Sequence, residues 1–161
     1  DYNKDRYKLS PKGKKYYESL KSSPTIEPLE VELDSVVFHE RLREEIRPLF
    51  ENGEYAKCVA SAGMFLEEEI RNKTRASTNI KGAELATFAF SPDKGKLNAP
   101  YCQDQGHKEG IHILYRGAFN YIRNLAIHHS KILKDQTVNL QMLTFLDLLV
   151  RLLDKANPRT K

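Results

Sequence analysis

Residues 116–129 read RGAFNYIRNLAIHH, a stretch that holds a cation, an amide and an imidazole close together as Arg123, Asn124 and His128. If the stretch is α-helical, Arg123 and His128 lie about 140° apart around the helix axis and about 7.5 Å apart along it. An arginine side chain can span that distance, so the two head groups could converge on one anion beside the helix. We therefore predict a phosphate-handling site with these three residues as its catalytic group. His129 is expected to face the interior and to have a structural role.

The same stretch belongs to a longer amphipathic helix, which the spacing of apolar residues predicts from residue 108 to 129. The stripe predicted to face the core consists of Ile111, Leu114, Ala118, Ile122 and Leu125. The opposite face carries Arg116 and Asn120, which we assign to phosphate binding or support of the site, and also Ile113 and Ile127. A face that mixes polar and apolar residues indicates burial against another surface, and we expect a homodimer.

Four further segments carry apolar residues at helical spacing. The predicted helices cover residues 38–50, 54–73, 81–90 and 138–156, with Asn52 and Gly53 ending the first and Asn157 and Pro158 ending the last. Pro48 lies inside the first helix and should kink it. The chain then has four main helices and a short one, and no strand pair is expected after residue 35. The predicted fold is all-α, an antiparallel helical bundle over residues 36–157.

The net charge of +4 is concentrated at the beginning of the chain. Residues 1–21 hold seven Lys or Arg against three Asp or Glu, whereas the remaining residues hold 19 of each kind. We interpret residues 1–23 as a basic segment and the proline-containing residues 24–35 as a linker or an extended arm packed on the domain. Residues 7–13, YKLSPKG, resemble the last wing strand of a winged-helix domain, which implies DNA contact through this segment; a basic solvated arm is the alternative. The neutral bundle predicts only a local nucleic-acid site.

Residues that bind metals do not occur here at the spacings that metal sites require. The run Glu67 to Glu69 is interpreted as a solvated helix face. The zinc motif His-Glu-x-x-His is not matched by the nearest candidates, His107, Glu109 and His112. We expect neither a metal nor a cofactor. Because Cys58 and Cys102 are too few for a disulfide framework and no apolar run could span a membrane, we predict a reduced, cytoplasmic protein without membrane contact.

Three segments together are similar to one known family. The pattern Arg-Asn-x-x-x-His near the end of a long helix is the Arg-x(4 to 6)-His signature of the HEPN superfamily, small helical domains of toxins, phage-defence systems and RNA-processing proteins. The wider pattern resembles the Ymh-type family of conserved hypothetical bacterial and phage proteins, which is grouped with HEPN domains. Its segments are FHERLREEIRPLFENGEYAKCV at 38–59, AFSP at 89–92 and LYRGAFNYIRNLAIHH at 114–129, within a resemblance that spans residues 36–156.

The resemblance implies metal-independent RNA cleavage by a dimeric defence or toxin-like protein whose two motifs face one cleft. His128 of each chain would then act as base and acid, Arg123 would stabilise charge on phosphorus, and Asn124 would orient the phosphate. Leu125 and Ile127 stand where the family usually has Pro and Ala, which leaves the orientation of His128 open.

A competing hypothesis makes the bundle a non-catalytic dimerisation or ligand-sensing module of a winged-helix DNA-binding regulator. The intact Arg-to-His spacing favours RNA as the partner, and the basic first segment favours DNA. The sequence identifies no antitoxin and no RNA target.

Overall fold

The computed structural model describes residues 10–15, 32–129 and 133–159. The chain divides into two compact units, residues 1–30 and residues 31–161. In the first unit the described residues form a short helical turn, in which the Ser10 hydroxyl accepts a hydrogen bond of 3.1 Å from the backbone N–H of Gly13. Of the strand-like residues 6–10 expected for a winged-helix domain, residues 6–9 lie outside the described residues.

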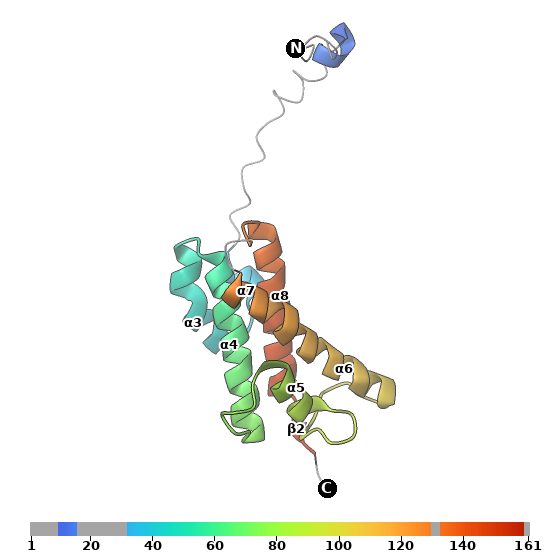
Figure 1. The fold of residues 1–161 in the computed structure, drawn as a ribbon. Coiled ribbons are helices and arrows are strands. Elements are labelled where there is room, and N and C mark those ends of the chain that lie inside the picture. The colour runs from blue at the N-terminus through green and yellow to red at the C-terminus, as the bar shows by residue number, and fades with distance from the viewer. Residues whose placement is uncertain (1–9, 16–31, 130–132, 160–161) are drawn as a thin grey trace, which may run out of the picture. The chain divides into compact units, whose positions relative to one another are not determined.

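The second unit is a bundle of helices with a minimal sheet (Figure 1). Its elements are α2 (Leu33–Val36), α3 (Glu40–Glu51), α4 (Tyr55–Thr74), α5 (Gly82–Phe90), β1 (Leu97–Asn98), α6 (Gln105–Gly117), η1 (Ala118–Arg123), α7 (Asn124–His128), α8 (Gln136–Asp154) and β2 (Asn157–Pro158). The all-α class predicted from the sequence is confirmed. Over the described residues, none of the helices is long and apolar enough to cross a membrane.

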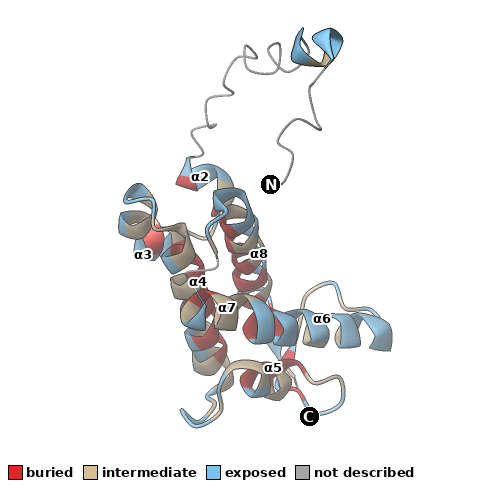
Figure 2. Ribbon diagram, turned by 45° about the horizontal axis from the view of Figure 1, so that its top comes forward, coloured by how far each residue is buried: buried red, intermediate tan, exposed pale blue. Residues whose placement is uncertain are grey.

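Helix α4 is the centre of the bundle, because α3, α5, η1, α7 and α8 all pack against it. Its predicted apolar stripe is buried at Val59, Ala62, Leu66 and Ile70, as the red segments of Figure 2 show for the bundle as a whole. Cys58 is also fully buried, and burial raises the pKa of its thiol to about 11. This thiol is therefore a core side chain and not a nucleophile.

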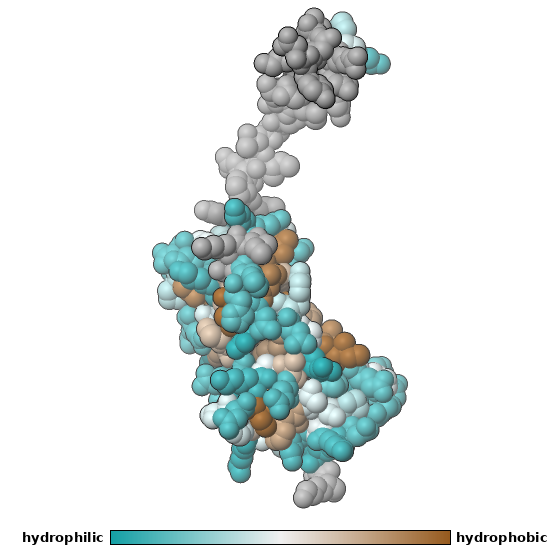
Figure 3. All heavy atoms as spheres, in the orientation of Figure 1, coloured by the Kyte–Doolittle hydropathy of each residue, from teal (hydrophilic) through white to brown (hydrophobic). Residues whose placement is uncertain are grey.

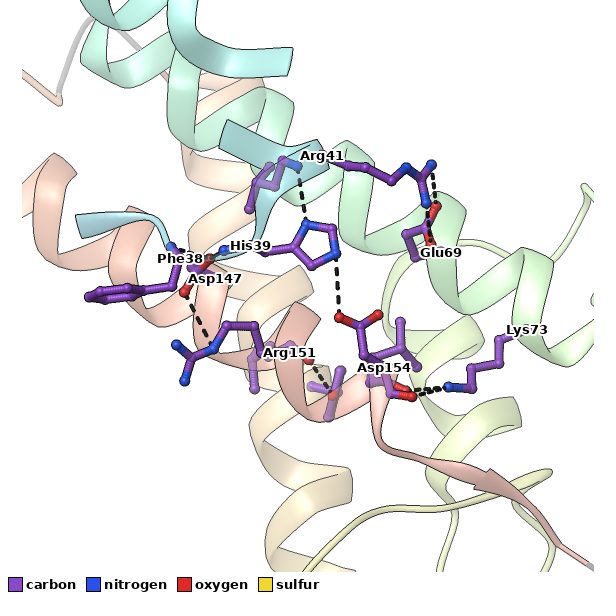
Figure 4. A network of polar contacts seen from close by, with 12 residues as sticks. Phe38, His39, Arg41, Glu69, Lys73, Asp147, Arg151 and Asp154 are labelled. Atoms are coloured by element: carbon purple, nitrogen blue, oxygen red, sulfur yellow. Dashed lines mark hydrogen bonds and ion pairs between the residues drawn. The ribbon is translucent and has the colours of Figure 1, made fainter. Parts of the chain in front are cut away.

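A buried carboxylate fixes the beginning of α3 against α8 (Figure 4). Asp147 is 1% exposed, and its Oδ1 accepts hydrogen bonds from the backbone N–H groups of Phe38 (3.0 Å) and His39 (2.8 Å). Leu33 of α2 also lies in the core, within the residues 24–35 that the sequence predicts to be a linker or an arm packed on the domain, and its burial agrees with the packed arm. The packed body thus includes a residue that precedes the expected start of the bundle.

His39 caps α3 with its imidazole. Its Nδ1 accepts a hydrogen bond of 3.1 Å from the backbone N–H of Leu42, so the proton of the neutral ring is on Nε2. That nitrogen lies 3.3 Å from Oδ2 of Asp154 at the end of α8. Lys73 of α4 donates to the carbonyl oxygens of Leu153 and Asp154, at 2.7 Å each. These contacts join the ends of three helices (Figure 4).

Two details of the predicted elements are wrong. β1 pairs with β2 in an antiparallel manner, although no strand pair was expected; Leu97 is 2% exposed, and its burial holds the pair against the bundle. The final helix ends at Asp154, before the predicted residue 156, because the chain turns to make this pair. Pro48 lies inside α3 as predicted, and the helix continues beyond it to Glu51.

The predicted long helix consists of α6, η1 and α7, in which η1 is a π-helix. The predicted core stripe is partly wrong, because Leu114 is 43% exposed whereas Tyr115, Phe119 and Ala126 are buried. Tyr115 is not in the predicted stripe, and its hydroxyl needs a partner in the core. The structure supplies one, since this hydroxyl donates a hydrogen bond of 2.7 Å to the carbonyl oxygen of Leu149.

Candidate functional site

The candidate residues lie where the long helix changes from π to α geometry. Arg123 is the last residue of η1, Asn124 is the first residue of α7 and His128 is the last. The backbone N–H of Asn124 bonds to the carbonyl of Phe119, five residues earlier, as in a π turn. Such turns are rare and frequently occur at functional sites. The helix continues through Leu125 to His128.

Arg123 is committed to an ion pair inside the bundle. Its Nη2 lies 3.0 Å from Oε2 of Glu67 on α4, and the side chains of Arg123 and Glu67 are 22% and 10% exposed. The other carboxylate oxygen of Glu67 accepts a hydrogen bond of 3.0 Å from Arg71. Glu67 therefore lies between two guanidinium groups. The prediction that Glu67 to Glu69 form a solvated face is wrong for Glu67, because these two arginines bring its carboxylate into the interior.

Arg71 is itself held in place by the backbone. Its Nη1 donates hydrogen bonds to the carbonyl oxygens of Ser77 (2.7 Å) and Ile80 (2.9 Å), in the connection between α4 and α5. The carboxylate of Glu67 is thus fixed from the side of Arg71, and it offers Arg123 a fixed partner.

Gly63 makes the contact between α4 and η1 possible. A Cβ atom at this position would lie 2.7 Å from Cγ and 2.9 Å from Cβ of Arg123, closer than non-bonded carbons approach. Glycine at this position is therefore what allows η1 to come so close to α4. The Nε of Arg123 is buried, and no atom of the described residues forms a hydrogen bond with it. The stem and the head of Arg123 are therefore both fixed against α4.

His128 faces a different part of the surface. A hollow beside the end of the long helix is lined by Asn120, Tyr121, Asn124, Leu125, His128 and His129. Both imidazoles are exposed. The prediction that His129 faces the core is wrong: the helix ends at His128, and His129 has non-helical backbone angles (φ −133°, ψ 29°), which place its ring outside the core.

Asn124 lies between Arg123 and the hollow and has a contact on each side. Its Oδ1 accepts a hydrogen bond of 3.2 Å from Nη1 of Arg123, and its Nδ2 makes a long contact of 3.5 Å to the carbonyl oxygen of Asn120. Arg123 itself lines a second hollow with Glu67, Arg71 and other residues of α4. The structure therefore brings Asn120, Asn124 and His128 together, and it places the guanidinium of Arg123 behind Asn124 instead of beside His128.

Arg116 is exposed on α6 and is not among the residues that line the hollow. Its charge acts on His112, whose Nε2 lies 3.1 Å from the hydroxyl of Thr87. Burial, and to a smaller extent the charge of Arg116, lowers the pKa of His112. Among the described residues, no group of three or more His, Cys, Asp or Glu side chains is placed to hold a metal ion.

The hollow can therefore supply imidazole nitrogens for proton transfer and amides for hydrogen bonds to a ligand. Sequence reasoning missed that Glu67 is part of the site. A signal was present, since Gly63, Glu67 and Arg71 are spaced four residues apart and so lie on one face of α4. The run of three glutamates obscured this signal, because such a run is usually solvated.

Comparisons with known proteins identify a family but no activity. A family model described as "Protein of unknown function (Hypoth_ymh)" matches residues 37–153. Neither the curated proteins nor the solved structures contain a match to this chain. Because the matched residues make up most of the sequence, the protein belongs to the Hypoth_Ymh family.

Proposed function

We propose that this member of the Hypoth_Ymh family is an HEPN-type endoribonuclease of a defence or toxin-like system, which cleaves RNA without a metal ion. The observation that carries the proposal is the hollow at the end of α7, where the exposed imidazole of His128 adjoins a second imidazole and two amides. These are groups that can transfer protons and bind a phosphodiester without a metal or a cofactor.

The proposed reaction is an internal transfer within the RNA strand. A base removes the proton of a ribose 2′-hydroxyl, whose oxygen forms a bond to phosphorus while the bond from phosphorus to the 5′-oxygen breaks. An acid protonates the departing 5′-oxygen. The products are a 2′,3′-cyclic phosphate and a 5′-hydroxyl. His128 is the proposed base or acid, because an imidazole can act in either role.

Two sources can provide the second imidazole. The family resemblance implies His128 of a second chain, in a cleft shared by the dimer. The structure adds His129 of the same chain, which lines the same hollow. The variant His129→Ala separates the two, because it removes cleavage only if both imidazoles come from one chain.

Arg123 supports the reaction through Asn124. Glu67 binds one end of the guanidinium, and the opposite nitrogen Nη1 donates to the side-chain oxygen of Asn124. This contact fixes the orientation of the amide, so that its NH2 group remains a donor on the side of the hollow. Arg123 is thus a positioning residue for Asn124, and it also places a positive charge behind the phosphate site.

The test is cleavage of single-stranded and structured RNA in EDTA by the wild-type chain and by His128→Ala and Arg123→Ala. We expect the wild type to yield 2′,3′-cyclic phosphate ends, His128→Ala to lose at least about 100-fold in rate, and Arg123→Ala to lose less. The matched control is His107→Ala, which removes an exposed imidazole outside the hollow and should cleave like the wild type. No cleavage by the wild type, or equal cleavage by all variants, contradicts the proposal.

A second candidate function is a dimerisation or ligand-sensing module of a DNA-binding regulator. The observation that favours it is the concentration of positive charge in residues 1–21. It predicts that the chain binds duplex DNA with an affinity that falls steeply with salt and that removal of this segment abolishes binding. Binding that survives the removal contradicts this candidate.

A further inference from the structure

Helix α6 presents an apolar face that no other part of the described chain covers. Of its residues, all of which are described, only Tyr115 is fully buried. Ile113 is 66% exposed, Leu114 is 43% exposed, and Tyr121 of the adjoining η1 is 64% exposed. Figure 2 shows α6 as a mostly exposed helix beside the bundle, and Figure 3 shows a hydrophobic patch over its middle. A helix with such a face usually packs against a partner.

Two glycines lie on the same face, and the fold of the chain itself does not require them. A Cβ atom at Gly110 or at Gly117 would have no atom of this chain within 4 Å. Glycine inside a helix costs about 1 kcal/mol relative to alanine. Since neither glycine is needed for packing within the chain, their use is explained by the close approach of something outside it.

Tyr121 is in line with this face because η1 is a π-helix. In an α-helix, a residue four positions after Gly117 would be about 40° past it around the axis. A π turn holds more residues than an α turn, which reduces this offset. The exposed face therefore runs from Gly106 at the start of α6 through Gly110, Gly117 and Tyr121.

Two charges of opposite sign border the apolar face on one side. Glu109 and Arg116 are seven residues apart, which is about two helical turns, and both are exposed. Neither forms an ion pair or a hydrogen bond within the described part of the chain. A partner surface would need the opposite charges at the same separation and in reverse order.

We infer that the occupant of this face is a second copy of the chain, with the two α6 helices packed antiparallel across a two-fold axis. In this register Ile113 meets Leu114 of the second copy, Gly110 meets its Gly117 and Tyr121 meets its Gly106. The two large aliphatic side chains thus pack on each other, and the ring of Tyr121 packs on a glycine. Every contact occurs twice by symmetry.

The charges select the antiparallel arrangement. Antiparallel helices related by a two-fold axis bring the same edges together, so Glu109 of one copy approaches Arg116 of the other, and this pair also forms twice. In a parallel arrangement the edge that carries Glu109 and Arg116 would meet the opposite edge of the other helix, so these two residues would not pair across the axis. A surface that complements itself in apolar size, in glycine position and in charge fits a copy of itself better than an unrelated protein.

The interface also assigns the second imidazole, a step that rests on the proposed function. The two-fold axis passes between Ile113 and Leu114, so His128 lies roughly 20 Å along the helix from it in each chain. The two hollows are then at opposite ends of the contact. Each hollow uses His128 and His129 of its own chain, and the second copy borders the hollow where its Gly106 meets Tyr121.

The first experiment is sedimentation equilibrium of the full chain with Glu109→Arg, Arg116→Glu and the double variant. We expect a wild-type dimer at micromolar concentration. Each single reversal should weaken it by about tenfold or more, because two attractive pairs become repulsive. The double variant should dimerise nearly as well as the wild type. A monomeric wild type, single reversals without effect, or a double variant as weak as the single ones each overturn the inference.

The second experiment replaces Gly117 by leucine. The side chain enters open space in the single chain, so we expect an unchanged circular dichroism spectrum and at least a tenfold weaker dimer. Leu148→Ala on α8 is the control, since it removes a side chain that is 42% exposed outside this face and should leave the dimer intact. A dimer that survives Gly117→Leu contradicts the interface.

The two proposals fail separately. If the chain dimerises through α6 and the wild type does not cleave RNA, the interface stands and the proposed function falls. If a monomeric Gly117→Leu variant is made and cleavage then depends on His128 and His129 as in the wild type, the assignment of both imidazoles to one chain is supported. Cleavage that is unaffected by His129→Ala contradicts that assignment without affecting the interface.

Discussion

Arg123 and His128 lie on two sides of one helical segment, and their surroundings are opposite in character. On the side of Arg123, Glu67 and Gly63 of α4 hold both the head and the stem of the side chain. On the side of His128, the imidazole is exposed at the edge of a hollow. The two residues share a sequence motif, yet one is part of the interior and the other is available to a ligand.

The difference follows from helix geometry and from the cost of burying charge. Five residues of helix turn the chain so that Arg123 points to α4 while His128 points away from it. A guanidinium that enters the interior needs a carboxylate partner, because an unpaired buried charge is costly. Glu67 is that partner. A motif therefore does not reveal which of its charged groups remain free.

The largest expected effect tests the interior side. Glu67→Ala leaves Arg71 and Arg123 without their shared carboxylate, and removal of one partner of a buried ion pair costs about 3–5 kcal/mol. We expect the free energy of unfolding, measured with urea, to fall by about 3 kcal/mol because part of Arg123 remains exposed. The control is Glu68→Ala, an exposed neighbour that should change it by less than about 0.5 kcal/mol. Equal losses for both variants contradict the buried role of Glu67.

The second effect tests the contact between α4 and η1. Gly63→Ala introduces a methyl group 2.7 Å from Cγ of Arg123, and we expect a loss of about 1–3 kcal/mol from overpacking. The matched control is Gly110→Ala, and both changes are made in the monomeric Gly117→Leu background because Gly110 lies in the proposed interface. In that background the added methyl group meets no atom of the chain and improves helix propensity by up to about 1 kcal/mol. Thermal unfolding should show opposite signs for the two variants; the same sign for both would mean that Gly63 is not needed for close approach.

A third effect concerns pH. The pKa of His112 is lowered in the folded chain from an ordinary value of 6.5, chiefly by burial, so the unfolded chain binds the proton more tightly. The free energy of unfolding contributed by His112 is therefore fully present above pH 6.5 and decreases as the pH falls towards the folded pKa. His112→Asn should flatten the pH dependence of the urea midpoint in this window. If the dependence is the same in the variant, another group causes it.

The smallest expected effect on stability is on the side of the hollow. His128→Ala removes an exposed side chain, so the free energy of unfolding should change by less than about 0.5 kcal/mol. Together with the loss of cleavage proposed above, an unchanged urea midpoint would separate function from folding at this position. A destabilisation comparable to that of Glu67→Ala would show that the two sides of the helix do not differ as described.

Periodicity in the sequence predicted the helices well where one face is apolar and uninterrupted. The apolar positions of α4 and the buried Leu146, Leu149 and Leu153 of α8 follow from spacing alone. The prediction failed where a polar atom enters the core. Tyr115 and Glu67 are buried because a carbonyl and two guanidinium groups receive them. The carbonyl of Leu149 and the guanidinium of Arg123 come from distant segments, whereas Arg71 lies one turn along α4 from Glu67.

The sequence by itself determined the all-α class, most helix boundaries and the set of side chains that could handle a phosphate. These properties depend on the chemistry and spacing of neighbouring residues, which any helix of this sequence would share. Only the tertiary structure decided that Arg123 is paired with Glu67, that His128 and His129 share a hollow and that α6 leaves its apolar face open. The reason is that burial and ion pairing depend on which segments meet, and those segments are far apart in the chain.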